Sequence, residues 1–186
     1  MSRTGSIILT VPEGVTVTVY PQEIIAVGKL GEDKISLATK FMSEIDVKLE
    51  DGKISTSIKS EQNKSKKEYK AVCGTINRLI NNLLEGVSTG FNKEIYMVGV
   101  GYKAEIKDDQ LVLTAGFSHL VYLDIPNDIK VEVNKNKTEF NISGINKQAV
   151  GDFADKVVKT RKPDPYGGKG VHYKGKPVRR KETKKK

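Results

Sequence analysis

Apolar residues recur at intervals of three and four between residues 69 and 84, with mostly polar residues between them. They are Tyr69, Val72, Cys73, Ile76, Leu79, Ile80, Leu83 and Leu84. This spacing predicts an α-helix with one apolar face that other parts of the chain must cover. Ser65 and Glu68 form a capping box at its start, and Gly86 is expected to end the helix in a left-handed conformation.

A second, shorter helix is predicted after residue 146. Its apolar face consists of Ala149, Val150, Phe153, Ala154, Val157 and Val158. Asn146 is the expected N-cap, because its side chain can accept hydrogen bonds from the free backbone amides of the first turn. Lys156, Lys159 and Arg161 lie toward the end, where cations complement the helix dipole, and Pro163 prevents the helix from continuing.

Strands are predicted wherever β-branched residues alternate with polar ones. The predicted strands cover residues 15–20, 45–49, 54–58, 95–106, 111–114, 121–125, 129–133 and 140–143. Asp51-Gly52 separates two of them and is typical of a tight hairpin turn.

The order of these elements indicates an internal duplication. Residues 33–41 (DKISLATKF) resemble residues 109–117 (DQLVLTAGF), and Ala71-Val72 and Ala149-Val150 occupy similar places in the two helices. Because strands precede a helix in each copy, we expect an α+β fold with two tandem related domains, each an antiparallel β-sheet packed on one face by a helix. The expected domains are residues 1–82, residues 83–162 and a basic extension, residues 163–186.

Composition narrows the class of protein. No stretch of about 18 uncharged apolar residues occurs, and the first residues lack the apolar region of a signal peptide. We therefore expect no membrane insertion and no secretion, and a cytoplasmic location. The single Cys73 cannot form an internal disulfide and leaves no thiol cluster for zinc or iron–sulfur chemistry.

Positive charge is concentrated at the carboxyl end. Residues 156–186 contain 13 Lys or Arg and two acidic residues, a balance of +11, whereas the rest of the chain has 19 basic and 21 acidic residues, a balance of −2. A near-neutral body with a cationic end indicates that a polyanion binds there, through Coulomb attraction and counterion release.

The segment beyond Pro163 has few core-forming residues and is predicted to become ordered only against a partner. Its cations alternate with glycines and with Tyr166, His172 and Tyr173. Cations contact phosphates, rings stack on bases or sugars, and glycines let a phosphate chain approach closely. A tail that only keeps the protein soluble is the alternative, but it would have no use for tyrosines.

Other motifs favour structure over catalysis. The run from Gly99 to Lys103 (GVGYK) lacks the third glycine and the immediate helix of a dinucleotide-binding loop, so we expect a bent strand with Lys103 facing a phosphate. His119 and His172 lack neighbours at metal-ligand spacing, and Cys73 lies on an apolar helix face. We expect no enzyme activity, metal, cofactor or small-molecule substrate; an enzyme acting at Cys73 or His119 is the weaker alternative.

Several segments, in order along nearly the whole chain, carry a likeness to a known family. They include GVSTGF (86–91), VGVGYKA (98–104), GFSH (116–119), RKPDPYGGKGVHY (161–173) and VRRKE (178–182). With these segments the chain resembles the bacterial-type family of large ribosomal subunit protein six. It departs from the family pattern at Thr4–Ile8 and at Leu120, where a proline is usual.

The resemblance implies a structural constituent of the large ribosomal subunit with two related domains. It implies binding to large-subunit rRNA near the translation-factor-binding centre, chiefly through the second domain and the basic extension, with neighbouring large-subunit proteins as further partners. It also implies a place in the cytoplasmic ribosome, or in that of an organelle. A general basic nucleic-acid-binding protein without ribosomal specificity is the alternative.

The residues expected to contact RNA combine cations, rings and glycines. They are Lys103, Lys156, Lys159, Arg161, Lys162, Tyr166, Gly167, Gly168, Lys169, Gly170, His172, Tyr173, Lys174, Arg179, Arg180 and Lys181. The cations are expected to pair with phosphates and the rings to stack or hydrogen-bond.

Overall fold

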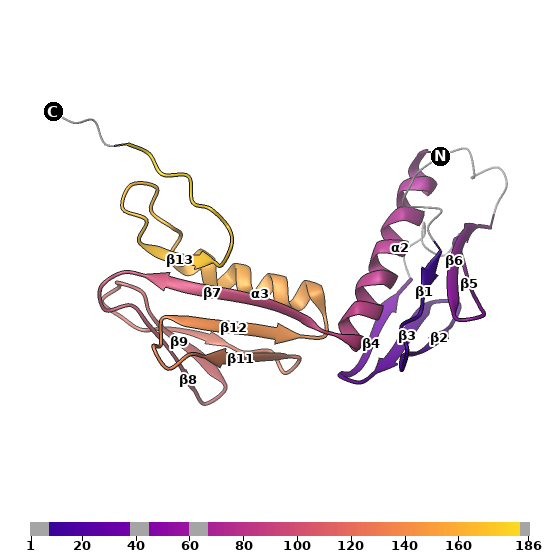
Figure 1. Cartoon of the computed structure of the whole chain (residues 1–186), viewed down its shortest axis with the longest axis horizontal. Coiled ribbons are helices and arrows are strands. Elements are labelled where there is room, and N and C mark those ends of the chain that lie inside the picture. The colour runs from indigo at the N-terminus through magenta and orange to yellow at the C-terminus, as the bar shows by residue number, and fades with distance from the viewer. Residues whose placement is uncertain (1–7, 38–44, 60–66, 183–186) are drawn as a thin grey trace. The chain divides into compact units, whose positions relative to one another are not determined.

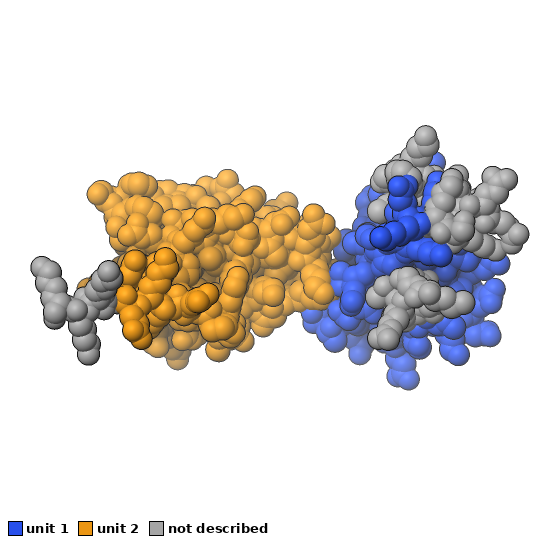
Figure 2. Space-filling view, turned by 90° about the horizontal axis from the view of Figure 1, so that it is seen from above, with its two compact units in different colours: residues 1–90 blue, residues 91–186 orange. Residues whose placement is uncertain are grey.

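The computed structural model describes residues 8–37, 45–59 and 67–182. The chain divides into two compact units, unit 1 (Met1–Gly90) and unit 2 (Phe91–Lys186), which Figure 2 shows in different colours. The division expected from the sequence, after residue 82, falls inside the helix α2 (Lys67–Ser88). Unit 1 extends to residue 90 because the last turns of α2 still contribute buried residues such as Leu84 and Val87 to its core.

Unit 1 contains, within the residues described, two antiparallel sheets and one helix. Its elements are β1 (Leu9–Thr10), β2 (Thr16–Val19), β3 (Glu23–Gly28), β4 (Gly31–Ser36), β5 (Ile45–Glu50), β6 (Lys53–Ile58) and α2. The strand orders are β1-β6-β5 and β2-β3-β4. The helix α2 packs against β3, β4 and β6 and buries the apolar face that the sequence predicted.

Unit 2 repeats this arrangement and adds one strand. Its elements are β7 (Phe91–Val98), β8 (Lys103–Lys107), β9 (Gln110–Thr114), β10 (Val121–Asp124), β11 (Ile129–Val133), β12 (Glu139–Gly144), α3 (Lys147–Thr160) and β13 (Gly170–Tyr173). The strand orders are β10-β9-β8 and β11-β12-β7-β13. The helix α3 packs on β7, β12 and β13, and Figure 1 shows it lying along the longer sheet.

The strand orders confirm the α+β class and the tandem duplication, although each unit has two sheets and not one. The sheet β1-β6-β5 corresponds to β7-β12-β11, and β2-β3-β4 corresponds to β8-β9-β10. The predicted alignment of residues 33–41 with 109–117 would match β4 to β9 and is wrong, because β9 takes the place of β3. The similarity is a turn followed by a strand, a local pattern that recurs in many hairpins. Residues 38–41 lie outside the described residues.

Most predicted strands are present. Two strands were missed, and one predicted strand is divided between two sheets. The strands β3 and β4 were not predicted, because apolar and polar residues do not alternate in their sequences, EIIAVG and GEDKIS. The strand predicted over residues 95–106 is divided by a turn at residues 99–102, so that β7 and β8 belong to different sheets.

The helix ends follow local chemistry. Asn146 caps α3 as predicted: its side-chain oxygen accepts hydrogen bonds from the amides of Gln148 and Ala149, at 3.0 and 3.1 Å. The predicted end of α2 at Gly86 is wrong, because Gly86 is buried inside the helix. The helix ends before Gly90, which has φ 74° and donates its amide to the carbonyl of Glu85. Ser65 of the predicted capping box lies outside the described residues.

The described part of the segment beyond Pro163, residues 164–182, contains a strand and is tied to the rest of unit 2, which corrects the prediction that it orders only against a partner. The strand β13 pairs antiparallel with β7, from Gly170 opposite Val98 to Tyr173 opposite Ile95. Val171 is fully buried and belongs to the core of unit 2. The burial of β13, with Val171 in the core, and an open strand edge therefore order a segment whose composition alone resembles a disordered tail.

Replacing Val171 with Ala should cost unit 2 about 2 kcal/mol of unfolding free energy, because the buried side chain loses two methyl groups. Urea denaturation followed by circular dichroism measures this change. The control is Val100→Ala, which removes the same atoms from a side chain that is 96% exposed and should change the free energy by less than about 0.5 kcal/mol. Equal stability of Val171→Ala and the parent chain would contradict the packing of β13.

Candidate nucleic-acid interface

The first part of the extension is a turn built around Asp164. The Asp164 amide donates to the Lys169 carbonyl at 2.8 Å, and the Gly168 amide donates to the Asp164 carbonyl at 2.9 Å. The Asp164 carboxylate accepts hydrogen bonds from the amides of Gly167, at 2.6 Å, and Tyr166, at 3.3 Å. These bonds fix residues 164–169 and leave the Tyr166 ring 55% exposed.

Gly170 carries the chain from this turn into β13. Its φ is 136°, and a Cβ there would lie 2.7 Å from the Lys162 carbonyl oxygen and 2.9 Å from the Cα of Pro163. No residue with a side chain fits this crossing. The next amide, of Val171, donates to the Arg161 carbonyl at 2.9 Å, so that β13 is also tied to the end of α3.

After β13 the chain turns back toward the first turn. The Lys174 amide donates to the Glu94 carbonyl, and the Lys181 amide donates to the Pro165 carbonyl, both at 2.9 Å. The Arg180 guanidinium lies against Gly168, where it would be 3.0 Å from an added Cβ. The cations at 179–181 are therefore held beside the Asp164 turn.

Most of the predicted RNA-contacting residues are exposed on unit 2. Exposed residues from the second half of α3 and the extension are Lys156, Lys159, Arg161, Lys162, Tyr166, Gly167, Lys169, Lys174, Arg179, Arg180 and Lys181, which we call the basic surface. Lys103 is also exposed but begins β8, in the other sheet of the unit.

Two cations of the basic surface have carboxylate partners within the protein. Lys159 forms an ion pair with Asp155 at 2.8 Å, and Lys174 forms one with Glu94. Each carboxylate raises the pKa of its lysine by accepting a hydrogen bond and by its charge. Exposed ion pairs of this kind contribute little to stability, so a phosphate can take the place of the carboxylate.

Four of the predicted residues are turned toward the protein. His172 is 4% exposed; its ring stacks on Tyr96, with centroids 4.9 Å apart, and its Nε2 is 2.9 Å from the Gly168 carbonyl oxygen. The Tyr173 hydroxyl donates to Asp155 at 3.2 Å, and burial raises the pKa of Tyr173 to about 12. Gly168 and Gly170 are buried as well. These residues hold the extension in place beneath its exposed cations.

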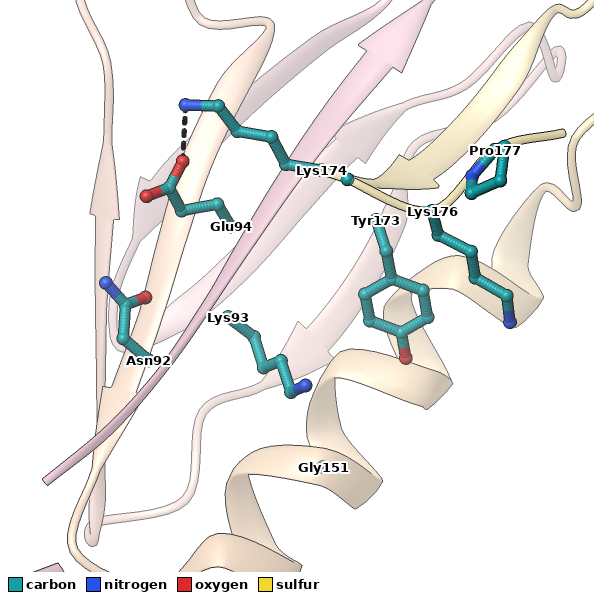
Figure 3. Close-up of a pocket in the computed structure, with 9 residues that line it drawn as sticks. Asn92, Lys93, Glu94, Gly151, Tyr173, Lys174, Lys176 and Pro177 are labelled. Atoms are coloured by element: carbon teal, nitrogen blue, oxygen red, sulfur yellow. Dashed lines mark ion pairs between the residues drawn. The ribbon is translucent and has the colours of Figure 1, made fainter.

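A groove lies between β7, α3 and the chain that follows β13, and Figure 3 shows its lining. It is lined by Asn92, Lys93, Glu94, Gly151, Tyr173, Lys174, Gly175, Lys176 and Pro177. Gly151 leaves open space on the helix side, since no atom lies within 4 Å of an added Cβ. The Lys176 ammonium is 5.8 Å from the centre of the Tyr173 ring.

Sequence reasoning did not select Lys93 and Lys176 as candidates. Lys93 lies on β7, far along the chain from the extension, and only the pairing of β13 with β7 brings it to the groove. Lys93 lies before the strand predicted over residues 95–106, and no local pattern indicated what would lie beside it.

The described part of the chain shows no group of three or more residues able to hold a metal ion. It also contains no helix with the length and apolar character needed to cross a membrane. Cys73 is 5% exposed on α2, and its sulfur lies 3.2 Å from the Thr56 hydroxyl. This burial agrees with the structural role that the helix pattern predicted.

The family model of ribosomal protein L6 matches residues 11–90 and 98–174, one match in each unit. The chain belongs to the ribosomal protein L6 family. It is 46% identical over 185 residues to large ribosomal subunit protein uL6 of Mycoplasmopsis synoviae, covering 99% of this chain and 98% of the relative. The same protein of Bacillus cereus is 42% identical over 185 residues, again covering 99% and 98%.

Membership of the L6 family confirms the resemblance found in the sequence. The two matched regions agree with the duplication seen in the strand orders. L6 proteins are structural components of the large ribosomal subunit and not enzymes, so the predicted class, a ribosomal protein of translation located in the cytoplasmic ribosome, is confirmed.

Acid should loosen the Asp164 turn of this L6 protein at a pH below the ordinary carboxyl range. Hydrogen bonds from the Gly167 and Tyr166 amides lower the pKa of Asp164 from its usual 3.8. Because the folded-state pKa is depressed, the contribution is complete above pH 3.8 and is lost as the pH falls through the lower folded value. NMR titration of the two amides should show this transition, and Asp164→Asn should abolish it. A midpoint at or above 3.8 would contradict the assignment.

Proposed function

We propose that this L6 protein binds large-subunit rRNA through unit 2 and its extension, near the centre where translation factors bind. The observation that carries the proposal is the basic surface: its exposed cations are held on a backbone that the protein folds by itself. The position near the factor-binding centre and the contacts with neighbouring ribosomal proteins are taken from the family resemblance.

A preformed cationic surface suits a folded RNA. The hydrogen bond from Lys181 to Pro165 places the cations of 179–181 beside Lys162 and Lys169 of the first turn. Several phosphates that converge in folded RNA repel one another, and cations at fixed positions neutralise them without a large loss of backbone entropy on binding. The protein therefore contributes by holding cations at fixed positions against the phosphates.

Recognition of RNA shape follows from the chemistry of the surface. The deep major groove of A-form RNA is too narrow for side chains, so contacts with phosphates, sugars and unpaired bases dominate. Tyr166, with its ring 55% exposed, is suited to stacking on such a base or sugar. His172, Gly168 and Gly170 are buried and support binding by fixing the extension. Tyr173 is partly buried and also lines the groove of Figure 3.

The groove of Figure 3 extends the cationic area. Lys93 from β7 and Lys174 and Lys176 from the chain after β13 line this groove, and Lys174 forms an ion pair with Glu94. An extended sugar–phosphate segment fits a groove with cations along its rim and a glycine, Gly151, on its floor.

Neutralising the triplet Arg179, Arg180 and Lys181 with Gln should weaken binding to protein-free large-subunit rRNA. The slope of log affinity against log salt should fall by roughly 2 to 3, since each lost phosphate contact contributes about 0.7 to 0.9. Filter binding across a salt series measures both quantities.

The matched control replaces Lys34, Lys48 and Lys53 of unit 1 with Gln, which removes the same charge from exposed positions. If both triplets lowered the slope equally, net charge and not the basic surface would govern binding. Equal affinity of the parent chain for duplex DNA and for rRNA would favour the general nucleic-acid binder instead. Crosslinking within purified large subunits would show whether the contacted nucleotides adjoin the factor-binding centre.

A further inference from the structure

Three planar side chains gather on the surface of unit 2, and two of them, Phe117 and His119, are not among the residues predicted to contact RNA. The rings of Phe117 and His119 are stacked, with centroids 5.6 Å apart and an angle of 21° between their planes. The Arg161 guanidinium carbon lies 5.1 Å from the centre of the Phe117 ring. All three residues are exposed, and Phe117 is 36% exposed.

The loop that carries Phe117 and His119 is anchored by the ring of Tyr102, which is only 7% exposed. Gly99 and Gly116 both pack on this ring: an added Cβ would lie 2.4 Å from it at Gly99 and 3.1 Å from its hydroxyl at Gly116. The two glycines therefore let the turn at 99–102 and the loop after β9 close on one side chain. The aromatic pair is held in place before any ligand arrives.

The same cluster adjoins the start of the extension. Arg161 supplies one of its three planar groups, and the Arg161 carbonyl accepts a hydrogen bond from Val171 of β13. Val98, which precedes the Gly99 turn, pairs with Gly170. The planar cluster and the basic surface are thus continuous through Arg161.

A purely structural role does not explain the exposure of these rings. The buried core of unit 2 includes Tyr102, Ala115 and Val171 but not Phe117 or His119. Rings that served only to close the core would be buried, because covering apolar area is the source of their stabilisation.

We propose that Phe117, His119 and Arg161 form a stacking platform for an unpaired nucleobase of the rRNA. The exposed imidazole of His119, backed by Phe117, offers a flat surface to the base, and the Arg161 guanidinium lies over the Phe117 ring as the third planar group. Every base has a π face, so the platform selects an unstacked base and not a particular sequence. This inference rests on the proposed rRNA binding and assigns a base-stacking contact to Phe117 and His119, which lie outside the basic surface.

The chain has no tryptophan, which allows a single reporter to be introduced. In His119→Trp the indole would take the place of the imidazole, and stacking of a base should quench its fluorescence as protein-free large-subunit rRNA is added. The control is Tyr122→Trp, at a side chain on β10 that is 58% exposed and should keep its emission. Filter binding of the same samples records complex formation independently.

Affinity gives a second readout that does not depend on the reporter. His119→Ala should weaken binding to the same rRNA by roughly 5- to 150-fold, the effect of losing one base–aromatic stack, whereas Tyr122→Ala should leave it unchanged. This comparison decides the matter if circular dichroism shows that His119→Trp does not fold.

The outcomes separate the two proposals. If rRNA binds but the indole at position 119 keeps its emission, or if His119→Ala binds as tightly as the parent chain, the platform is wrong and the basic surface remains. If the parent chain does not bind rRNA at all, both proposals are overturned.

Discussion

The pairing of β13 with β7 is the interaction on which the rest of unit 2 depends. Through it Val171 enters the core, His172 stacks on Tyr96, and the cations on either side of the strand are brought back to the surface. A sheet edge offers unpaired amides and carbonyls, and adding a strand satisfies them at little cost when one residue of that strand can also be buried. The cationic extension is therefore part of the fold and not an appendage to it.

The duplication shows how one framework is used for two purposes. Among the residues described, both units have two corresponding three-stranded arrangements and a helix, and unit 2 has the further strand β13 at the edge of β7. In unit 1 the strand that corresponds to β7 is β1. The chain continues from α2 directly into unit 2 and does not return to the edge of β1. The excess of positive charge lies in the end of α3 and in the extension, since residues 156–186 carry a balance of +11. An added strand thus turns a neutral framework into a candidate RNA-binding surface.

Local patterns predicted the parts of this structure that local chemistry determines. The cap at Asn146 and the apolar faces of both helices could be predicted, because helix capping and the three-and-four spacing of apolar residues depend only on residues close together in the sequence. The burial of His172 and Val171 could not be predicted, since it depends on a partner strand more than 70 residues earlier in the chain. Gly86 was mistaken for a helix end because its burial comes from tertiary packing. For the same reason the aromatic residues predicted to contact RNA differ in burial: Tyr166 is exposed and His172 is buried.

Amide hydrogen exchange in the free chain, without RNA, tests most directly whether the extension folds by itself. The amides of Val171 and Lys174 donate to Arg161 and Glu94, so they should exchange as slowly as amides in the centre of β7. Exchange at the rate of an unstructured peptide, with protection appearing only after rRNA is added, would contradict the account. It would mean that the RNA, and not β7, gives the extension its shape.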